Sequence, residues 1–95
     1  MVTSVTIDLP PMQVPAKRSV TIDGHRTSVS LEDAFWRALG QIACARGDKR
    51  AALIAAIDHA RPPEVGLATA LRLFVLHEIR AGKDTGQLGP APDKA

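Results

Sequence analysis

The sequence predicts one small, mostly α-helical domain with one short β-strand per protomer, completed by a second copy of the chain. One alternating segment, at 26–31, precedes three stretches whose apolar residues recur at helical spacing. The chain has 95 residues, of which 45% are hydrophobic and only 3% aromatic, so a lone protomer buries little apolar area. A lone strand also leaves unpaired N–H and C=O groups on both edges. A homodimer would remove both costs.

The chain begins with a predicted flexible arm over 1–17, in which proline is frequent and Lys17 and Asp8 are the charged residues. The β region follows at 19–31 and contains the turn signal Asp23-Gly24. Two interpretations are open. Residues 19–22 and 27–31 form a hairpin within the chain, or 26–31 is the single functional strand and 17–24 is an arm that leads into it. We favour the single strand.

The first helix is predicted over 31–46, with Ser30 as N-cap, Asp33 three residues later, and Gly47 as C-cap. Its apolar stripe consists of Leu31, Phe35, Ala38, Leu39 and Ile42.

The second helix is predicted to begin at Asp48 as N-cap and to end near Arg61, before Pro62-Pro63. The third helix is predicted over 67–80 and ends before Gly82. It is apolar over nearly its whole surface and is therefore expected to be buried on more than one side. These elements define a domain over 18–81. Residues 82–95 are predicted to be a disordered tail, because they are rich in Gly and Pro and poor in apolar residues.

The basic excess lies in the first half of the domain. Residues 17–50 carry seven basic and four acidic groups, whereas residues 51–95 carry five of each, against a net charge of +2 for the whole chain. A nucleic-acid surface is therefore expected in the strand and first-helix half.

Other chemistry finds little support in the sequence. The single cysteine, Cys44, excludes a disulfide within the chain and is expected to be buried beside the apolar stripe. No signal peptide and no apolar run of about 20 residues is present, which predicts a cytoplasmic protein without a membrane partner. No C-x-x-C or H-x-x-x-H spacing and no glycine-rich phosphate loop occurs. We therefore predict no catalytic residue, no metal and no cofactor.

The stretch from Arg26 to Ile57, RTSVSLEDAFWRALGQIACARGDKRAALIAAI, resembles the ribbon-helix-helix DNA-binding proteins of the Arc, MetJ and CopG type. Residues 18–81 are similar to a bacterial subgroup with a third helix, and GHRTSVSLE and ALRLFVL carry this likeness. The resemblance implies an intertwined homodimer. Paired strands enter the major groove of DNA, and the N-termini of the second helices hold flanking phosphates. Members commonly act as transcriptional repressors, and many are antitoxins.

The resemblance maps onto particular residues. Since strand side chains alternate, an inward Thr27, Val29 and Leu31 leave three candidate base contacts facing outward: Arg26, Ser28 and Ser30. Arg26 can bond guanine O6 and N7 in a bidentate manner. The candidate phosphate contacts are Lys49, Arg50, Ala51, Lys17, Arg18 and His25. The candidate dimer core is Val29, Leu31, Phe35, Leu39, Ile42, Leu53, Ile54 and Ile57. A ribbon of two strands fits the major groove, whereas a four-stranded sheet does not, which is why we favour a single strand per chain.

The sequence therefore predicts a sequence-specific, double-stranded DNA-binding transcriptional regulator that acts as a repressor. The alternative is an antitoxin or protein-interaction module that uses the apolar helix 67–80, with DNA binding secondary. A tetramer built through this helix and Trp36 is a further alternative to the homodimer.

Overall fold

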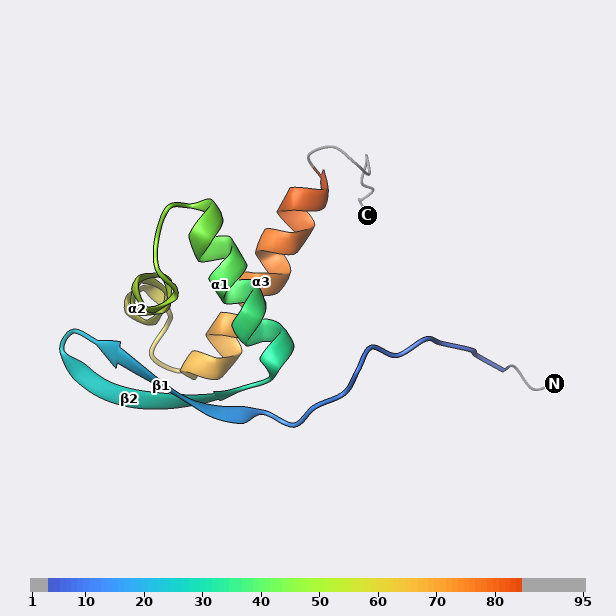
Figure 1. Ribbon diagram of the computed structural model, residues 1–95, viewed down its shortest axis with the longest axis horizontal. Coiled ribbons are helices and arrows are strands. Elements are labelled where there is room, and N and C mark those ends of the chain that lie inside the picture. Colours follow the sequence, from blue (N-terminus) through green and yellow to red (C-terminus); the bar gives the residue numbers. More distant parts are fainter. Residues whose placement is uncertain (1–3, 85–95) are drawn as a thin grey trace.

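Two strands at the start of the domain form an antiparallel hairpin, and three helices lie on one face of it (Figure 1). The structure is a computed structural model that describes residues 4–84. The elements, in chain order, are β1 (Ala16–Ile22), β2 (His25–Leu31), α1 (Asp33–Ala45), α2 (Arg50–Ala60) and α3 (Leu67–Asp84). Residues 4–15 are exposed, belong to no helix or strand, and extend away from the body (Figure 1).

The hairpin forms within one chain, so the preference for a single strand at 26–31 is wrong. The register runs from Ala16 opposite Leu31 to Ile22 opposite His25. Asp23 and Gly24 join the strands with φ values of 54° and 79°, as a two-residue type I′ turn requires. Such a short loop closes at little entropic cost. The N–H and C=O groups along one edge of β2 are therefore hydrogen-bonded to β1 of the same chain and need no second chain.

Helix α1 begins later than predicted. Ser30 is still part of β2, and the N-cap is Glu32, which makes no side-chain capping bond. The predicted capping by Ser30 is therefore wrong, because the strand register continues to Leu31.

The end of α1 agrees with the sequence. Gly47 has a φ of 79°, and its N–H donates to Cys44 O at 3.0 Å. The N–H of Asp48 donates to Ala43 O at 2.8 Å, which completes a Schellman motif. Because this motif holds the backbone of Asp48, the N-cap of α2 is Lys49 and not Asp48 as predicted.

Helix α2 stops at Ala60, just before Pro62-Pro63 as expected, but α3 is longer than predicted. It continues through Gly82 to Asp84, so residues 82–84 of the predicted tail are helical. Residues 85–95 of that tail lie outside the described residues. No helix within residues 4–84 combines the length and the apolar character needed to cross a membrane.

The core lies between the inner face of the hairpin and the three helices. Its buried residues are Val20, Ile22, Val29, Leu31, Leu39, Ala43, Leu53, Ile54, Leu71 and Val75. Five of the predicted dimer-core residues are buried in this core, and Phe35, Ile42 and Ile57 pack against it partly buried. The apolar faces of one chain thus cover one another, and their burial alone does not require a second copy.

Ion pairs fasten α3 to both ends of α1. Arg72 donates to both carboxylate oxygens of Glu32, at 2.9 and 3.2 Å, and Arg46 lies 3.1 Å from Glu78. The hydrogen bonds from Arg72 lower the pKa of Glu32. Cys44 is exposed and not buried as predicted, because it lies about 140° around α1 from the buried Leu39.

Candidate nucleic-acid interface

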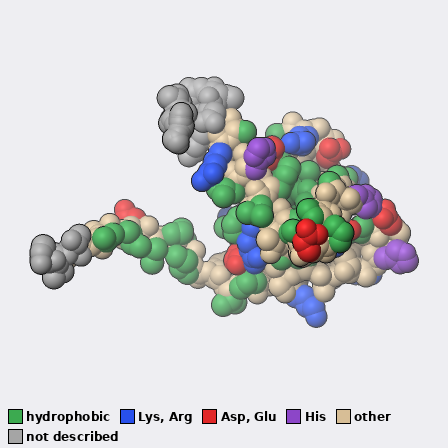
Figure 2. All heavy atoms as spheres, turned by 180° about the vertical axis from the view of Figure 1, so that it is seen from behind, with side chains coloured by type: hydrophobic (Ala, Val, Ile, Leu, Met, Phe, Trp, Pro, Cys, Tyr) green, Lys and Arg blue, Asp and Glu red, His purple; other side chains and the backbone are tan. Residues whose placement is uncertain are grey.

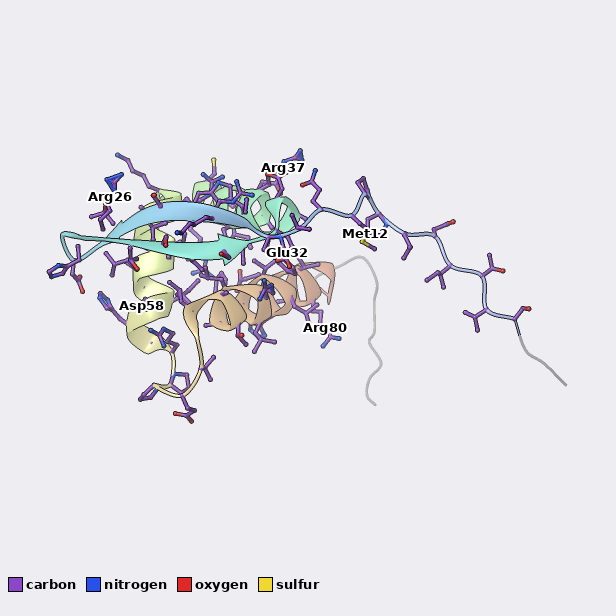
Figure 3. All side chains as sticks on the ribbon, turned by 90° about the horizontal axis from the view of Figure 1, so that it is seen from below. Met12, Arg26, Glu32, Arg37, Asp58 and Arg80 are labelled. Atoms are coloured by element: carbon purple, nitrogen blue, oxygen red, sulfur yellow. The ribbon has the colours of Figure 1, made fainter. Side chains whose placement is uncertain are left out.

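The hairpin face turned away from the helices is polar and exposed, and we call it the outer face (Figure 3). It consists of Lys17, Ser19 and Thr21 from β1 and Arg26, Ser28 and Ser30 from β2. Within residues 4–84, none of these six side chains makes a hydrogen bond or ion pair with another part of the chain. Their donors and acceptors are therefore available to a ligand.

Strand register places a basic side chain near each end of the outer face. Lys17 lies opposite Ser30, Ser19 opposite Ser28, and Thr21 opposite Arg26. The structure thus brings the three predicted base contacts together on one face.

Sequence reasoning missed Ser19 and Thr21 on this face, because it assigned them to the arm. The Asp23-Gly24 turn signal could have found them. Thr27, predicted to face the core, is exposed near the turn.

The start of α2 lies beside this face. A hollow is lined by Ser19, Thr21 and Arg26 of the hairpin and by Trp36, Arg50 and Ala51 of the helices. Lys49 and Ala51 are exposed there, and no side chain caps the helix. The N–H groups of an uncapped first turn carry partial positive charge, which favours an anion. The exposed carboxylate of Asp48 lies just before this turn, and its negative charge disfavours an anion there.

Arg50, a predicted phosphate contact, is bound internally. Its Nε donates to Trp36 O at 3.0 Å, and its guanidinium carbon lies 4.5 Å from the centre of the Trp36 ring. Gly40 leaves the space for this packing, since a Cβ there would overlap the guanidinium and lie 2.9 Å from its Cζ. Arg50 therefore joins the start of α2 to α1.

Arg18, another predicted phosphate contact, points to the inner side of the hairpin. Its side chain is 20% exposed, approaches Leu31 O and Asp33, and lies 5.3 Å from the centre of the Trp36 ring. The remaining predicted phosphate contacts, Lys17, His25, Lys49 and Ala51, are all exposed.

The hairpin turn is tied to the last turn of α2. Asp23 Oδ2 lies 2.7 Å from His59 Nε2, and this hydrogen bond raises the pKa of His59. The two residues are 36 positions apart, and no sequence signal indicated their contact. Among residues 4–84, no group of three or more His, Cys, Asp and Glu side chains is placed to hold a metal ion.

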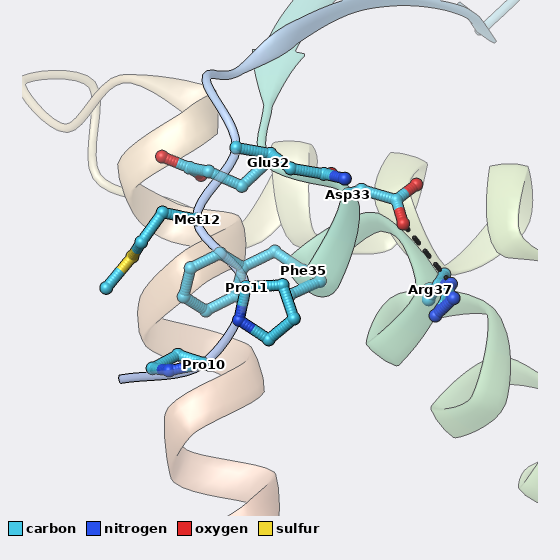
Figure 4. Close-up of a pocket in the computed structure, with 9 residues that line it drawn as sticks. Pro10, Pro11, Met12, Glu32, Asp33, Phe35 and Arg37 are labelled. Carbon is cyan, nitrogen blue, oxygen red and sulfur yellow. Dashed lines mark ion pairs between the residues drawn. The ribbon is translucent and has the colours of Figure 1, made fainter. Parts of the chain in front are cut away.

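Two further hollows lie away from the outer face. Pro10, Pro11 and Met12 of the arm border the first, against Phe35 and the Asp33–Arg37 ion pair of α1 (Figure 4). Beyond it, the arm exposes the hydrophobic side chains of Val5, Ile7 and Leu9 (Figure 2).

The second hollow lies between α2 and α3 and has a volume of about 510 Å³. Its lining is mainly apolar and includes Leu53, Ile57, Leu73 and Phe74. Predicted to be buried on several sides, α3 instead leaves Leu73, Leu76 and Ile79 between 44% and 58% exposed.

A two-stranded ribbon with a polar outer face, followed by two helices, defines a class of DNA-binding folds, and the comparison with known families agrees. The ribbon-helix-helix domain matches residues 15–79, more than half of the chain, so the chain belongs to this family. Members bind DNA and dimerise, and they are typically transcription regulators or antitoxins. The third helix, also predicted, is present, and the match covers it as far as residue 79. Neither a curated protein nor a solved structure matches the chain at a significant level.

Proposed function

We propose that this chain is a sequence-specific regulator of transcription, acting as a repressor, that inserts the outer face of its own hairpin into the major groove of double-stranded DNA. The observation that carries the proposal is the outer face itself, which is exposed and has no hydrogen-bond or ion-pair partner among residues 4–84. Two paired strands about 4.8 Å apart fit a major groove about 12 Å wide.

Base recognition falls to the outer face. Arg26 presents a planar fork that matches guanine O6 and N7. Ser28 and Ser30, with Ser19 and Thr21, supply small hydroxyl groups that donate or accept and let the backbone approach the bases. They discriminate less than Arg26 does, because a hydroxyl group suits several base edges.

The start of α2 is proposed to bind the phosphate backbone of the DNA. The hollow beside β1 places Ala51 next to Ser19 and Thr21, so a phosphate flanking the groove would meet the uncapped N–H groups. Lys49 adds positive charge there, and His25 supplies a further phosphate contact near the turn of the hairpin. Arg18 and Arg50 are left to their internal contacts.

The proposed active species is a homodimer in which each chain supplies a whole ribbon. Family membership supports the dimer, and so do the exposed apolar residues Leu73, Leu76 and Ile79 of α3. A thermal midpoint that rises with protein concentration is expected, whereas a folded monomer at micromolar concentration in sedimentation would contradict the dimer. We place the protein in the cytoplasm, on the nucleoid when bound to DNA, and assign it no enzymatic activity.

Selection of bound sites from random duplex DNA tests the function. The parent protein should enrich one sequence. Ser28→Glu places a carboxylate in the middle of the outer face and should abolish enrichment. Gln41→Glu adds the same charge at an exposed position of α1 and should leave enrichment intact. No enriched sequence with a folded parent protein would overturn the proposal.

A second candidate function has its own support. The apolar hollow between α2 and α3 and the exposed Leu73 suit a protein partner, as an antitoxin or interaction module would require. In that case Leu73→Glu would abolish partner binding, and Ser28→Glu would not.

A further inference from the structure

The two strands of the hairpin are similar to each other. Lys17–Ile22 of β1 reads KRSVTI and Arg26–Leu31 of β2 reads RTSVSL. At an offset of nine residues, five of the six positions hold the same kind of side chain: Lys17 and Arg26, Ser19 and Ser28, Val20 and Val29, Thr21 and Ser30, Ile22 and Leu31.

Because of the strand register, this sequence similarity gives the hairpin an approximate two-fold symmetry. Ser19 lies opposite Ser28, so a half-turn about an axis through that pair exchanges the strands. It brings Lys17 onto Arg26 and Thr21 onto Ser30. The inner face follows the same relation, since Val20 and Val29 are both 6% exposed and Ile22 and Leu31 are 8% and 0% exposed. One chain thus carries a ribbon with approximate two-fold symmetry.

We propose that this single-chain ribbon reads a nearly palindromic DNA element with both of its strands, and that Lys17 is a specificity residue equivalent to Arg26. The inference rests on the proposed function and deepens it. An axis through the middle of the outer face coincides with the local dyad of the duplex. Lys17 and Arg26 then meet equivalent bases on opposite DNA strands.

The chemistry of the two cationic side chains predicts which bases the DNA site contains. Both cationic side chains bond guanine O6 and N7, but arginine does so with a rigid planar fork and discriminates more strongly. Lys17 and Arg26 lie four residue steps apart along the ribbon, about 13 Å. That length spans about four base pairs. We expect two guanines on opposite strands at about this separation, and a stronger preference at the Arg26 half.

Exchanging the two cations tests the inference. Site selection is repeated with Lys17→Arg, with Arg26→Lys and with the double exchange. Lys17→Arg should strengthen the guanine preference at the weaker half about tenfold, which makes the site more symmetric. Arg26→Lys should weaken the stronger half by a similar factor. The double exchange should reverse the direction of the site.

The matched control is Lys49→Arg, the same substitution at the start of α2, which should leave the base preferences unchanged because phosphate contacts carry no sequence information. All three substituted positions are exposed, and thermal unfolding verifies that each variant is folded. If the parent enriches a site and Lys17→Arg does not alter its base preferences, the two-strand inference is overturned and the proposed function stands. If the folded parent enriches no site, the proposed function is overturned as well.

Discussion

The two faces of the hairpin are built from alternate residues of the same strands, yet they differ in almost every physical respect. On the inner face, Val20, Ile22, Val29 and Leu31 are at most 8% exposed and pack under the helices. On the outer face, six polar side chains have no partner within residues 4–84. Because strand side chains alternate, one step along the chain separates a residue that holds the fold from one available to a ligand. Stability and binding are therefore expected to respond to different substitutions.

The largest effect is expected on the inner face. Leu31 is 0% exposed, so Leu31→Ala should lower the free energy of unfolding by about 2–5 kcal/mol, measured by urea denaturation. Ser30→Ala, one residue earlier on the outer face, should change it by less than about 0.5 kcal/mol, since Ser30 caps no helix. If both variants lost a similar amount of unfolding free energy, the claim that only the inner face stabilises the fold would be wrong.

The next effect belongs to the outer face. Arg26→Ala should weaken binding to the selected site by about 1–3 kcal/mol and relax the preference at one base position. The unfolding free energy should stay within about 0.5 kcal/mol of the parent value. Arg37→Ala removes the same charge from an exposed position on α1 and serves as the control in a titration at fixed salt. Equal losses of affinity would show that only net charge matters.

Gly40→Ala tests whether Arg50 is a structural residue or a DNA contact. The new methyl group displaces the Arg50 guanidinium from its place against α1, without touching the outer face. If Arg50 positions the start of α2, affinity should fall by about 1 kcal/mol, the scale of one hydrogen bond. The fluorescence of Trp36, the single tryptophan, reports the displacement. Higher affinity would instead assign Arg50 to a phosphate.

Asp48→Asn probes the start of α2 from the other side. The substitution removes a negative charge beside the expected phosphate and should strengthen binding by about 0.3–1 kcal/mol at low salt. The gain should be equal on specific and random DNA and should shrink as salt rises. A gain on specific DNA alone would place Asp48 near a base and not near a phosphate.

The smallest effect concerns the hairpin turn, where neither face is involved. Asp23 raises the pKa of His59, so their ion pair stabilises the fold fully below the ordinary pKa of 6.5. This contribution is lost as pH rises through the higher folded-state pKa. The thermal midpoint of the parent should be slightly higher below pH 6.5 than at a pH above the folded-state pKa of His59. In Asp23→Asn this difference should disappear. An unchanged pH dependence in the variant would contradict the contact.

The sequence predicted those features that depend on neighbouring residues. The Gly47 cap of α1, the proline stop after α2 and the alternation of exposed and buried residues at 28–31 are all local signals. Several of the predictions that failed depended on contacts between distant residues. Nothing near Arg18 or Arg50 in the chain indicates that both lie over Trp36, and nothing near Glu32 indicates that Arg72 binds it. The preference for a single strand fails because it rests on the width of the groove, whereas the Asp23-Gly24 turn is a local signal that indicates the hairpin.

The hairpin also has a consequence in time. Pairing across a two-residue turn is a local event that takes about 1–10 microseconds and does not depend on protein concentration. A ribbon assembled from two chains must instead wait for two molecules to meet. In this chain the polar outer face is complete as soon as the strands close, even when only a few copies of the protein are present.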